Sequence, residues 1–133
     1  MAASHGLRAP SSIEKESVVR GHHVYKAIWT PVIGEELSLR AEDNNEHDNH
    51  AVAVLKGRNV IGHVPRSIST AAWFFLKRGG HITCRITGKR KLGVGLEVPC
   101  VYTFSGSIKV LDKLSRLFSE ESHPHVQNHS CPQ

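Results

Sequence analysis

Short runs of apolar, or alternating apolar and polar, residues recur along most of the chain, a pattern typical of buried or half-buried β-strands. These runs occupy residues 24–29, 37–40, 51–55, 60–64, 81–87 and 96–104. The third and fourth runs are separated by Gly57-Arg58-Asn59, a turn signal that predicts an antiparallel hairpin. Pro99 falls inside the last run and predicts an edge position or a bulge, because proline has no N–H to donate to a ladder.

One segment between these strands has helical periodicity. Residues 66–78 carry apolar side chains at helical spacing, and they follow Pro65, which is well suited to the first turn of a helix. Ser67 or Ser69 is predicted to cap the helix, and Gly79-Gly80 to end it.

A second helix is predicted at residues 107–118. Its apolar residues form one stripe, at Ile108, Leu111, Leu114, Leu117 and Phe118. Two roles for this stripe stay open: it covers the strands of the same domain, or it binds a partner protein.

Together these elements predict a mainly β fold with helices, namely a small six-stranded, partly open barrel of the SH3 or OB kind. One internal helix and one C-terminal helix accompany the barrel. A length of 133 residues has room for one domain, which we expect to span residues 18–118. Residues 1–17 and the histidine-rich residues 119–133 are polar and lack periodicity, so we expect two disordered tails.

The remaining composition narrows the class of protein. No apolar run approaches the roughly 20 residues of a membrane span, and the first residues lack the apolar centre of a signal peptide. Cys84, Cys100 and Cys131 have no paired spacing, which predicts reduced thiols in a nuclear or cytoplasmic protein rather than a secreted one. Phosphate-loop, hydrolase and metalloprotease motifs are absent, so we expect no enzyme and no cofactor. The histidines match no closed zinc pattern, so we expect no metal.

Charge is distributed unevenly along the chain, whose net charge is +5. No acidic residue lies between Asn49 and Leu96, a stretch that is rich in lysine and arginine. Such separation suits an anionic partner such as nucleic acid, although a solvated surface that maintains solubility is the plain alternative. Lys89, Arg90 and Lys91 could follow a phosphate backbone.

Trp73-Phe74-Phe75 could offer a surface on which bases stack. The helical spacing places at least Phe75 in the core, and we expect Trp29 to lie in the core as well.

The polar loop at residues 42–50 precedes the predicted hairpin and is rich in Asp, Asn, Glu and His. A carboxylate at Asp48, beside Asn45 and His47, has the chemistry to accept a hydrogen bond from a sugar hydroxyl. The alternative is that Asp48 and Asn45 cap a turn by accepting hydrogen bonds from nearby backbone N–H groups.

Several of these residues, in this order, resemble a known family. The set comprises Arg40, Asn45, Asp48, Ala51-Val52, Ile61-Gly62-His63-Val64 and Arg66. It is similar to the HIRAN domain, a small β-barrel module found in helicase-like DNA-repair ATPases and also alone. The resemblance covers roughly residues 18–104 and implies binding to the 3′ end of single-stranded DNA.

The resemblance also implies roles for particular residues. Asp48 would accept the 3′-hydroxyl, Asn45 would make a polar contact, Arg66 and His63 would meet phosphate, and Phe104 would line the floor of the pocket. His47 stands where DNA-binding members have a base-stacking tyrosine, and the other stacking tyrosine aligns with Val24 or Tyr25. We therefore expect Tyr25 and His47 to flank the terminal base.

The sequence thus predicts a non-catalytic module that binds a single-stranded DNA end in a DNA-repair or replication-fork context. The alternative is a protein-interaction adaptor that keeps the barrel and binds a repair ATPase or another protein through the helix at residues 107–118.

Overall fold

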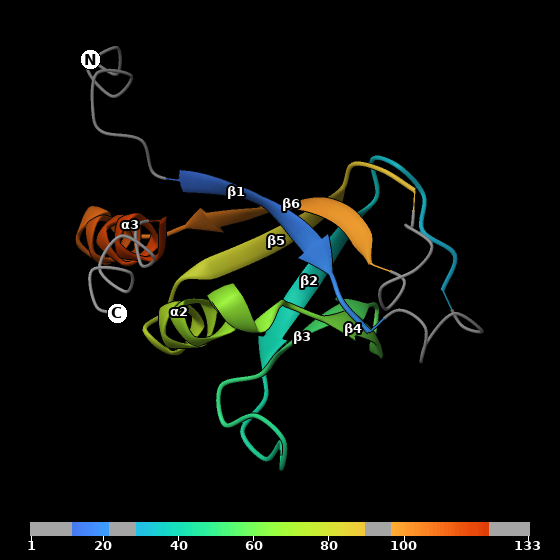
Figure 1. Cartoon of the computed structure of the whole chain (residues 1–133), viewed down its shortest axis with the longest axis horizontal. Helices are drawn as coiled ribbons and strands as arrows, with labels where there is room; N and C mark the ends of the chain where they lie inside the picture. The colour runs from blue at the N-terminus through green and yellow to red at the C-terminus, as the bar shows by residue number, and fades with distance from the viewer. Residues whose placement is uncertain (1–11, 22–28, 90–96, 123–133) are drawn as a thin grey trace, which may run out of the picture.

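The computed structural model describes residues 12–21, 29–89 and 97–122. Within them, six strands form one antiparallel sheet, accompanied by the helices α2 (Arg66–Lys77) and α3 (Ile108–Ser122) (Figure 1). From one edge of the sheet to the other the strands are β1 (Ser12–Val19), β6 (Val98–Ser105), β5 (His81–Ile86), β2 (Glu36–Ala41), β3 (Val52–Lys56) and β4 (Asn59–His63). The predicted mainly β fold with an internal and a C-terminal helix is confirmed.

The two edge strands meet at one end of the sheet. Arg20, directly after β1, and His63, the last residue of β4, exchange two backbone N–H to O=C hydrogen bonds of 2.8 Å each. This bridge curls the sheet into a barrel that is closed at one end and open along the rest of the two edges. Gly62 permits the approach, because a Cβ at this position would lie 2.5 Å from Val19 Cγ1 and 2.8 Å from the Arg20 carbonyl oxygen.

The N-terminal strand corrects the predicted domain boundary. Residues 12–17, which the sequence places in a disordered tail, belong to β1, and this strand pairs with β6 from Ser12↔Ser105 to Val19↔Val98. The strand escapes recognition because Glu14, Lys15 and Glu16 give it little apolar character, whereas ladder hydrogen bonds join backbone groups whatever the side chain. The predicted strand at 24–29 lies outside the described residues, apart from the buried Trp29.

Pro99 does not lie on an edge strand, because β6 sits between β1 and β5. Its carbonyl accepts a hydrogen bond of 3.0 Å from the N–H of Thr87, the residue just after β5. The N–H that proline lacks therefore faces the side where the β5 ladder has ended, so a proline is tolerated in a central strand.

α2 packs on the sheet through Ile68, Ala72 and Phe75, and Phe75 is 2 % exposed, as the sequence predicts. The predicted serine cap is wrong: the helix begins after Pro65 and has no side-chain cap. The Pro65 carbonyl instead accepts hydrogen bonds from the N–H groups of Ile68 and Ser69. The glycine stop is confirmed, since Gly79 has a φ of +91° and Gly80 donates its N–H to the Phe75 carbonyl.

α3 lies against α2 and β1 at one end of the sheet (Figure 1). Leu111, Leu114 and Phe118 are buried, and the Phe118 ring lies 5.4 Å from the ring of Phe104 in the core. The apolar stripe therefore covers the chain's own domain. Ile108 and Leu117 of the same stripe stay exposed, so the alternative in which this helix binds a partner remains a prediction. The helix also continues to Ser122, beyond the predicted end of the domain.

Candidate nucleic-acid interface

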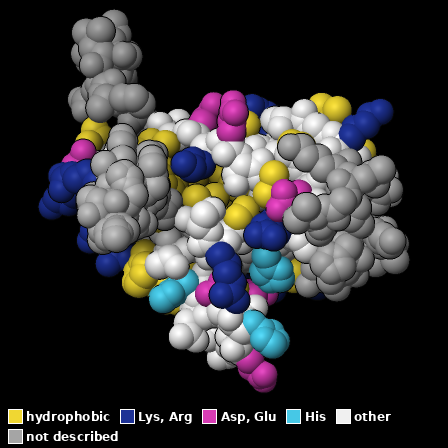
Figure 2. Space-filling model, in the orientation of Figure 1, with side chains coloured by type: hydrophobic (Ala, Val, Ile, Leu, Met, Phe, Trp, Pro, Cys, Tyr) yellow, Lys and Arg dark blue, Asp and Glu magenta, His cyan; other side chains and the backbone are white. Residues whose placement is uncertain are grey.

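A cavity of about 350 Å³ lies where the barrel closes. It is lined from the end of β1, the loop between β2 and β3, the end of β4 and the start of α2. The lining residues are Arg20, Gly21, Asn45, His47, Asp48, Ala51, His63, Val64 and Arg66. On the face seen in Figure 2, Lys or Arg and His side chains gather at the lower centre, above the loop that projects from the bottom of Figure 1.

Five of the residues predicted from the sequence share this cavity, namely Asn45, His47, Asp48, His63 and Arg66. They come from three separate segments of the chain. The bridge between Arg20 and His63 brings β4 to the end of β1, and Pro65 then directs the chain into α2, so that Arg66 faces the loop. One cavity is therefore shared by the Asp48 carboxylate and the Arg66 guanidinium.

Hydrogen bonds within the loop give it a defined shape. Asn45 Oδ1 accepts from the backbone N–H groups of His47 (2.8 Å) and Asp48 (3.1 Å), and Asp48 Oδ1 accepts from the N–H of His50 (2.9 Å). The turn-capping alternative is thus observed for both side chains. These bonds occupy Asp48 Oδ1 and hold the carboxylate at the cavity, while Oδ2 takes no part in them.

Glu42 supports the cavity from behind its lining. Its Oε1 accepts hydrogen bonds from Asn45 Nδ2 (2.9 Å) and from His63 Nε2 (3.1 Å). Its carbonyl accepts one from Trp73 Nε1 (3.1 Å). The Glu42 carboxylate therefore connects the loop to β4, and the Glu42 carbonyl connects the loop to α2. Sequence reasoning missed this role, because Glu42 and His63 are 21 residues apart and no local pattern links them.

Arginines border the cavity on two sides. Arg66 Nη2 donates a hydrogen bond of 2.7 Å to the His47 carbonyl, which ties the loop to the first turn of α2. Arg20, which sequence reasoning also missed, forms an ion pair of 3.3 Å with Glu97 and keeps half of its side-chain surface exposed. Because Asp48 lines the same cavity, the cavity offers both a carboxylate acceptor and guanidinium donors.

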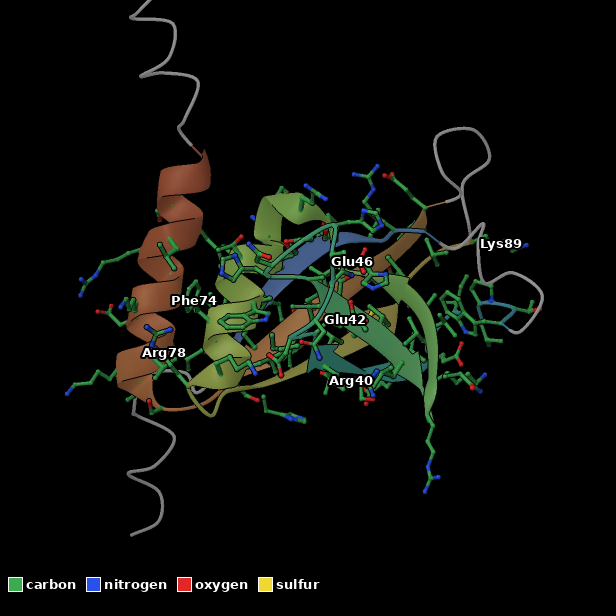
Figure 3. All side chains as sticks on the ribbon, turned by 90° about the horizontal axis from the view of Figure 1, so that it is seen from below. Arg40, Glu42, Glu46, Phe74, Arg78 and Lys89 are labelled. Carbon is green, nitrogen blue, oxygen red and sulfur yellow. The ribbon has the colours of Figure 1, made fainter. Side chains whose placement is uncertain are left out.

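The other predicted site residues lie elsewhere. Phe104 is 1 % exposed and its ring lies 5.5 Å from that of Phe75, so its predicted role in lining the pocket is wrong. Phe104 faces the core because it alternates along β6 in phase with the buried Cys100 and Tyr102. Lys89 is exposed and does not line the cavity; in Figure 3 it lies at the right edge, to one side of Glu42 and Glu46. Tyr25, Arg90 and Lys91 lie outside the described residues.

Among residues 12–21, 29–89 and 97–119, no three His, Cys, Asp or Glu side chains are placed to hold a metal ion. The hydrogen bond with Cys100, together with burial, raises the pKa of Cys84, so this thiol stays protonated and is a poor nucleophile. No helix in the described part of the chain is long and apolar enough to cross a membrane.

Fold and cavity together define a small, partly open β-barrel module with a cavity, lined mainly by polar side chains, at its closure. The family model for the HIRAN domain matches residues 17–109, which is more than half of the chain. The chain therefore belongs to the HIRAN family.

Solved structures share this fold at low sequence identity. The crystal structure of the HIRAN domain of human HLTF is 19% identical, with a TM-score of 0.67, over 84% of this chain and 93% of that chain. The NMR structure of the HLTF HIRAN domain in its DNA-bound conformation is 18% identical, with a TM-score of 0.62, over 84% and 88% of the two chains. A protein from Lactobacillus plantarum is 12% identical, with a TM-score of 0.51, over 71% and 99%. A search of curated proteins finds no match.

Proposed function

We propose that the chain binds single-stranded DNA and that the cavity holds the free 3′-hydroxyl end of the strand. Membership of the HIRAN family supports DNA as the ligand, as does the fold shared with the HLTF HIRAN domain, which has a DNA-bound conformation. The observation that carries the proposal is the meeting of Asp48 with Arg66 and His63 in one cavity.

The arrangement of charge suits an end with a hydroxyl. A carboxylate accepts a hydrogen bond from a hydroxyl group but repels a terminal phosphate. Asp48 therefore reads the end, whereas Arg66 and Arg20 border the same cavity and donate to the phosphates that precede the last sugar. The exposed His47 lies at the rim, where its ring stacks on the terminal base.

The proposal limits which basic residues contact the bound end. Lys89 does not line the cavity and is not assigned to the end-binding site. We assign the module to a DNA-repair or replication-fork setting in the nucleus or cytoplasm, where free 3′ ends are exposed. Binding alone is proposed, without catalysis.

The test compares oligonucleotides that carry a 3′-hydroxyl with the same oligonucleotides carrying a 3′-phosphate, by fluorescence anisotropy at low salt. We expect the wild-type chain to prefer the hydroxyl by about tenfold, which corresponds to one charge-assisted hydrogen bond. Asp48→Asn removes the charge but keeps an oxygen that accepts the His50 N–H, so the loop is retained and the preference is lost. Asp112→Asn, on the exposed face of α3, is the matched control and keeps the preference.

Two results would contradict the proposal. Equal affinity of the wild-type chain for both ends removes end recognition, and absence of binding at low salt removes nucleic acid as the ligand.

A further inference from the structure

The outer face of α2 carries a cluster of aromatic rings that the cavity does not use. The ring centroids of Trp73 and Phe74 lie 5.1 Å apart, and the His50 ring lies 4.9 Å from the first and 5.1 Å from the second. Phe74 is 38 % exposed, whereas its neighbour Phe75 is buried. The cluster therefore presents aromatic surface to solvent instead of completing the core.

Cations accompany these rings. Lys77 Nζ lies 5.1 Å from the centroid of the Trp73 ring, and the Arg78 guanidinium lies 5.1 Å from that of Phe74. Phe74 and Arg78 lie beside each other along α2 in Figure 3. α2 contains no acidic residue, and Asp43, in the adjoining loop, forms an ion pair with Lys77 at 2.6 Å. Surfaces that bind single-stranded nucleic acid combine exposed aromatic rings, on which bases stack, with basic side chains.

This face continues from the cavity. Arg66 and Trp73 are seven residues apart, about two helical turns, so they project from the same side of α2. The rise from Arg66 to Phe74 is about 12 Å, at about 1.5 Å per residue. The loop joins the two surfaces as well, because Asp48 Oδ1 accepts the His50 N–H and the Glu42 carbonyl accepts the Trp73 indole N–H.

We propose that the α2 face, comprising His50, Trp73, Phe74, Lys77 and Arg78, is a second contact surface for the same DNA strand. It binds the nucleotides that precede the end held in the cavity, and it thus rests on the proposed function. A base stacks on the exposed part of Phe74 and on the Arg78 guanidinium, while Lys77 and Arg78 meet the backbone phosphates. The basic charge of α2 and its continuity with the cavity favour nucleic acid over a protein partner.

The test measures affinity as a function of oligonucleotide length, with a free 3′-hydroxyl throughout. For the wild-type chain, we expect a decanucleotide to bind at least about tenfold more tightly than a dinucleotide, because each base stacked on an aromatic ring adds to the affinity. Phe74→Ala should lower the decanucleotide affinity about tenfold and leave the dinucleotide affinity unchanged. Alanine is a stronger helix former than phenylalanine, so α2 is retained, and circular dichroism verifies this. Ile33→Ala, at another exposed apolar residue, is the control and should change neither affinity.

A second readout follows backbone amide shifts by NMR. The amide signals of Phe74, Lys77 and Arg78 should shift with the decanucleotide and stay in place with the dinucleotide.

The outcomes separate the two proposals. Unchanged decanucleotide affinity in Phe74→Ala, or amide shifts that stop at the cavity, overturns the α2 face while the end-binding proposal stands. Loss of decanucleotide affinity in Phe74→Ala without any 3′-hydroxyl preference in the wild type supports the α2 face and overturns the end-binding proposal. If no oligonucleotide binds or shifts an amide, both proposals are overturned. If a protein partner binds at Phe74 and excludes DNA, only the α2 face is overturned.

Discussion

Two connections flank β2, and each is held by a glutamate and a tryptophan. In the turn before β2, residues 29–35, Trp29 Nε1 donates a hydrogen bond of 3.2 Å to Glu35 Oε1. In the loop after β2, residues 42–50, the carbonyl of Glu42 accepts a hydrogen bond of 3.1 Å from Trp73 Nε1. The same pair of residue types thus anchors both connections.

The carboxylates of Glu35 and Glu42 nevertheless hold different partners. Glu35 accepts the Val32 N–H (3.2 Å) and pairs with Lys56 Nζ (2.6 Å), so its hydrogen bonds stay within one turn and the adjacent hairpin. Glu42 instead holds Asn45 and His63, both of which line the cavity. An anchored loop becomes a binding site when its anchor orients side chains toward a cavity. The turn at Glu35 presents exposed Val32 and Ile33, and neither residue lines the cavity described above.

The largest expected effect compares Gly62, where the barrel closes beside the cavity, with Gly34, in the turn before β2. Gly62→Ala should lower the free energy of unfolding by about 2–3 kcal/mol, because the new Cβ would overlap Val19 Cγ1 and the Arg20 carbonyl where the barrel closes. Gly34→Ala, in the turn before β2, meets no atom within 4 Å and is strained only by its φ of +94°. It should cost about 1–2 kcal/mol. Urea denaturation measures both, and a larger loss for Gly34→Ala would show that the closure is not tight.

A second comparison separates binding from stability. Glu42→Ala should lower affinity for a 3′-hydroxyl oligonucleotide about tenfold, because Asn45 and His63 lose their shared acceptor. Glu35→Ala should leave that affinity unchanged and lower the free energy of unfolding by about 1 kcal/mol. Anisotropy titrations and urea denaturation of both variants check this. If Glu35→Ala weakens binding as much as Glu42→Ala, the two connections do not differ in function.

The smallest expected effect concerns pH. Burial raises the pKa of the Glu35 carboxyl, but hydrogen bonds from Lys56, Trp29 and the Val32 N–H outweigh it, and the net pKa is lowered from the ordinary value of 4.5. A lowered folded-state pKa stabilises the fold above the unfolded-state value, and this stabilisation is lost as pH falls through the folded-state value. The difference in unfolding free energy between wild type and Glu35→Gln should therefore shrink below about pH 4.5. Glu36→Gln, at the exposed neighbouring glutamate, is the control; a constant difference for Glu35→Gln would contradict the account.

Local chemistry made much of the site predictable from the sequence. The apolar runs and the Gly57-containing turn predicted the β3–β4 hairpin, and Pro65 with Gly79-Gly80 predicted the extent of α2. The density of Asp and Asn in residues 42–50 raised the alternative of a turn held by its own side chains, and the hydrogen bonds of Asn45 and Asp48 show such a turn. Each of these features depends on residues close in sequence, so a short pattern suffices to reveal it.

Only the tertiary structure decided what those elements build together. β1 is a strand because β6 supplies backbone partners to a polar segment, and Phe104 is in the core because β6 turns that face inward. The cavity exists because Gly62 lets two edge strands meet, and Glu42 shapes it by reaching a histidine 21 residues away. Contacts between distant segments depend on how the whole sheet curls, and no local pattern of side chains encodes that geometry.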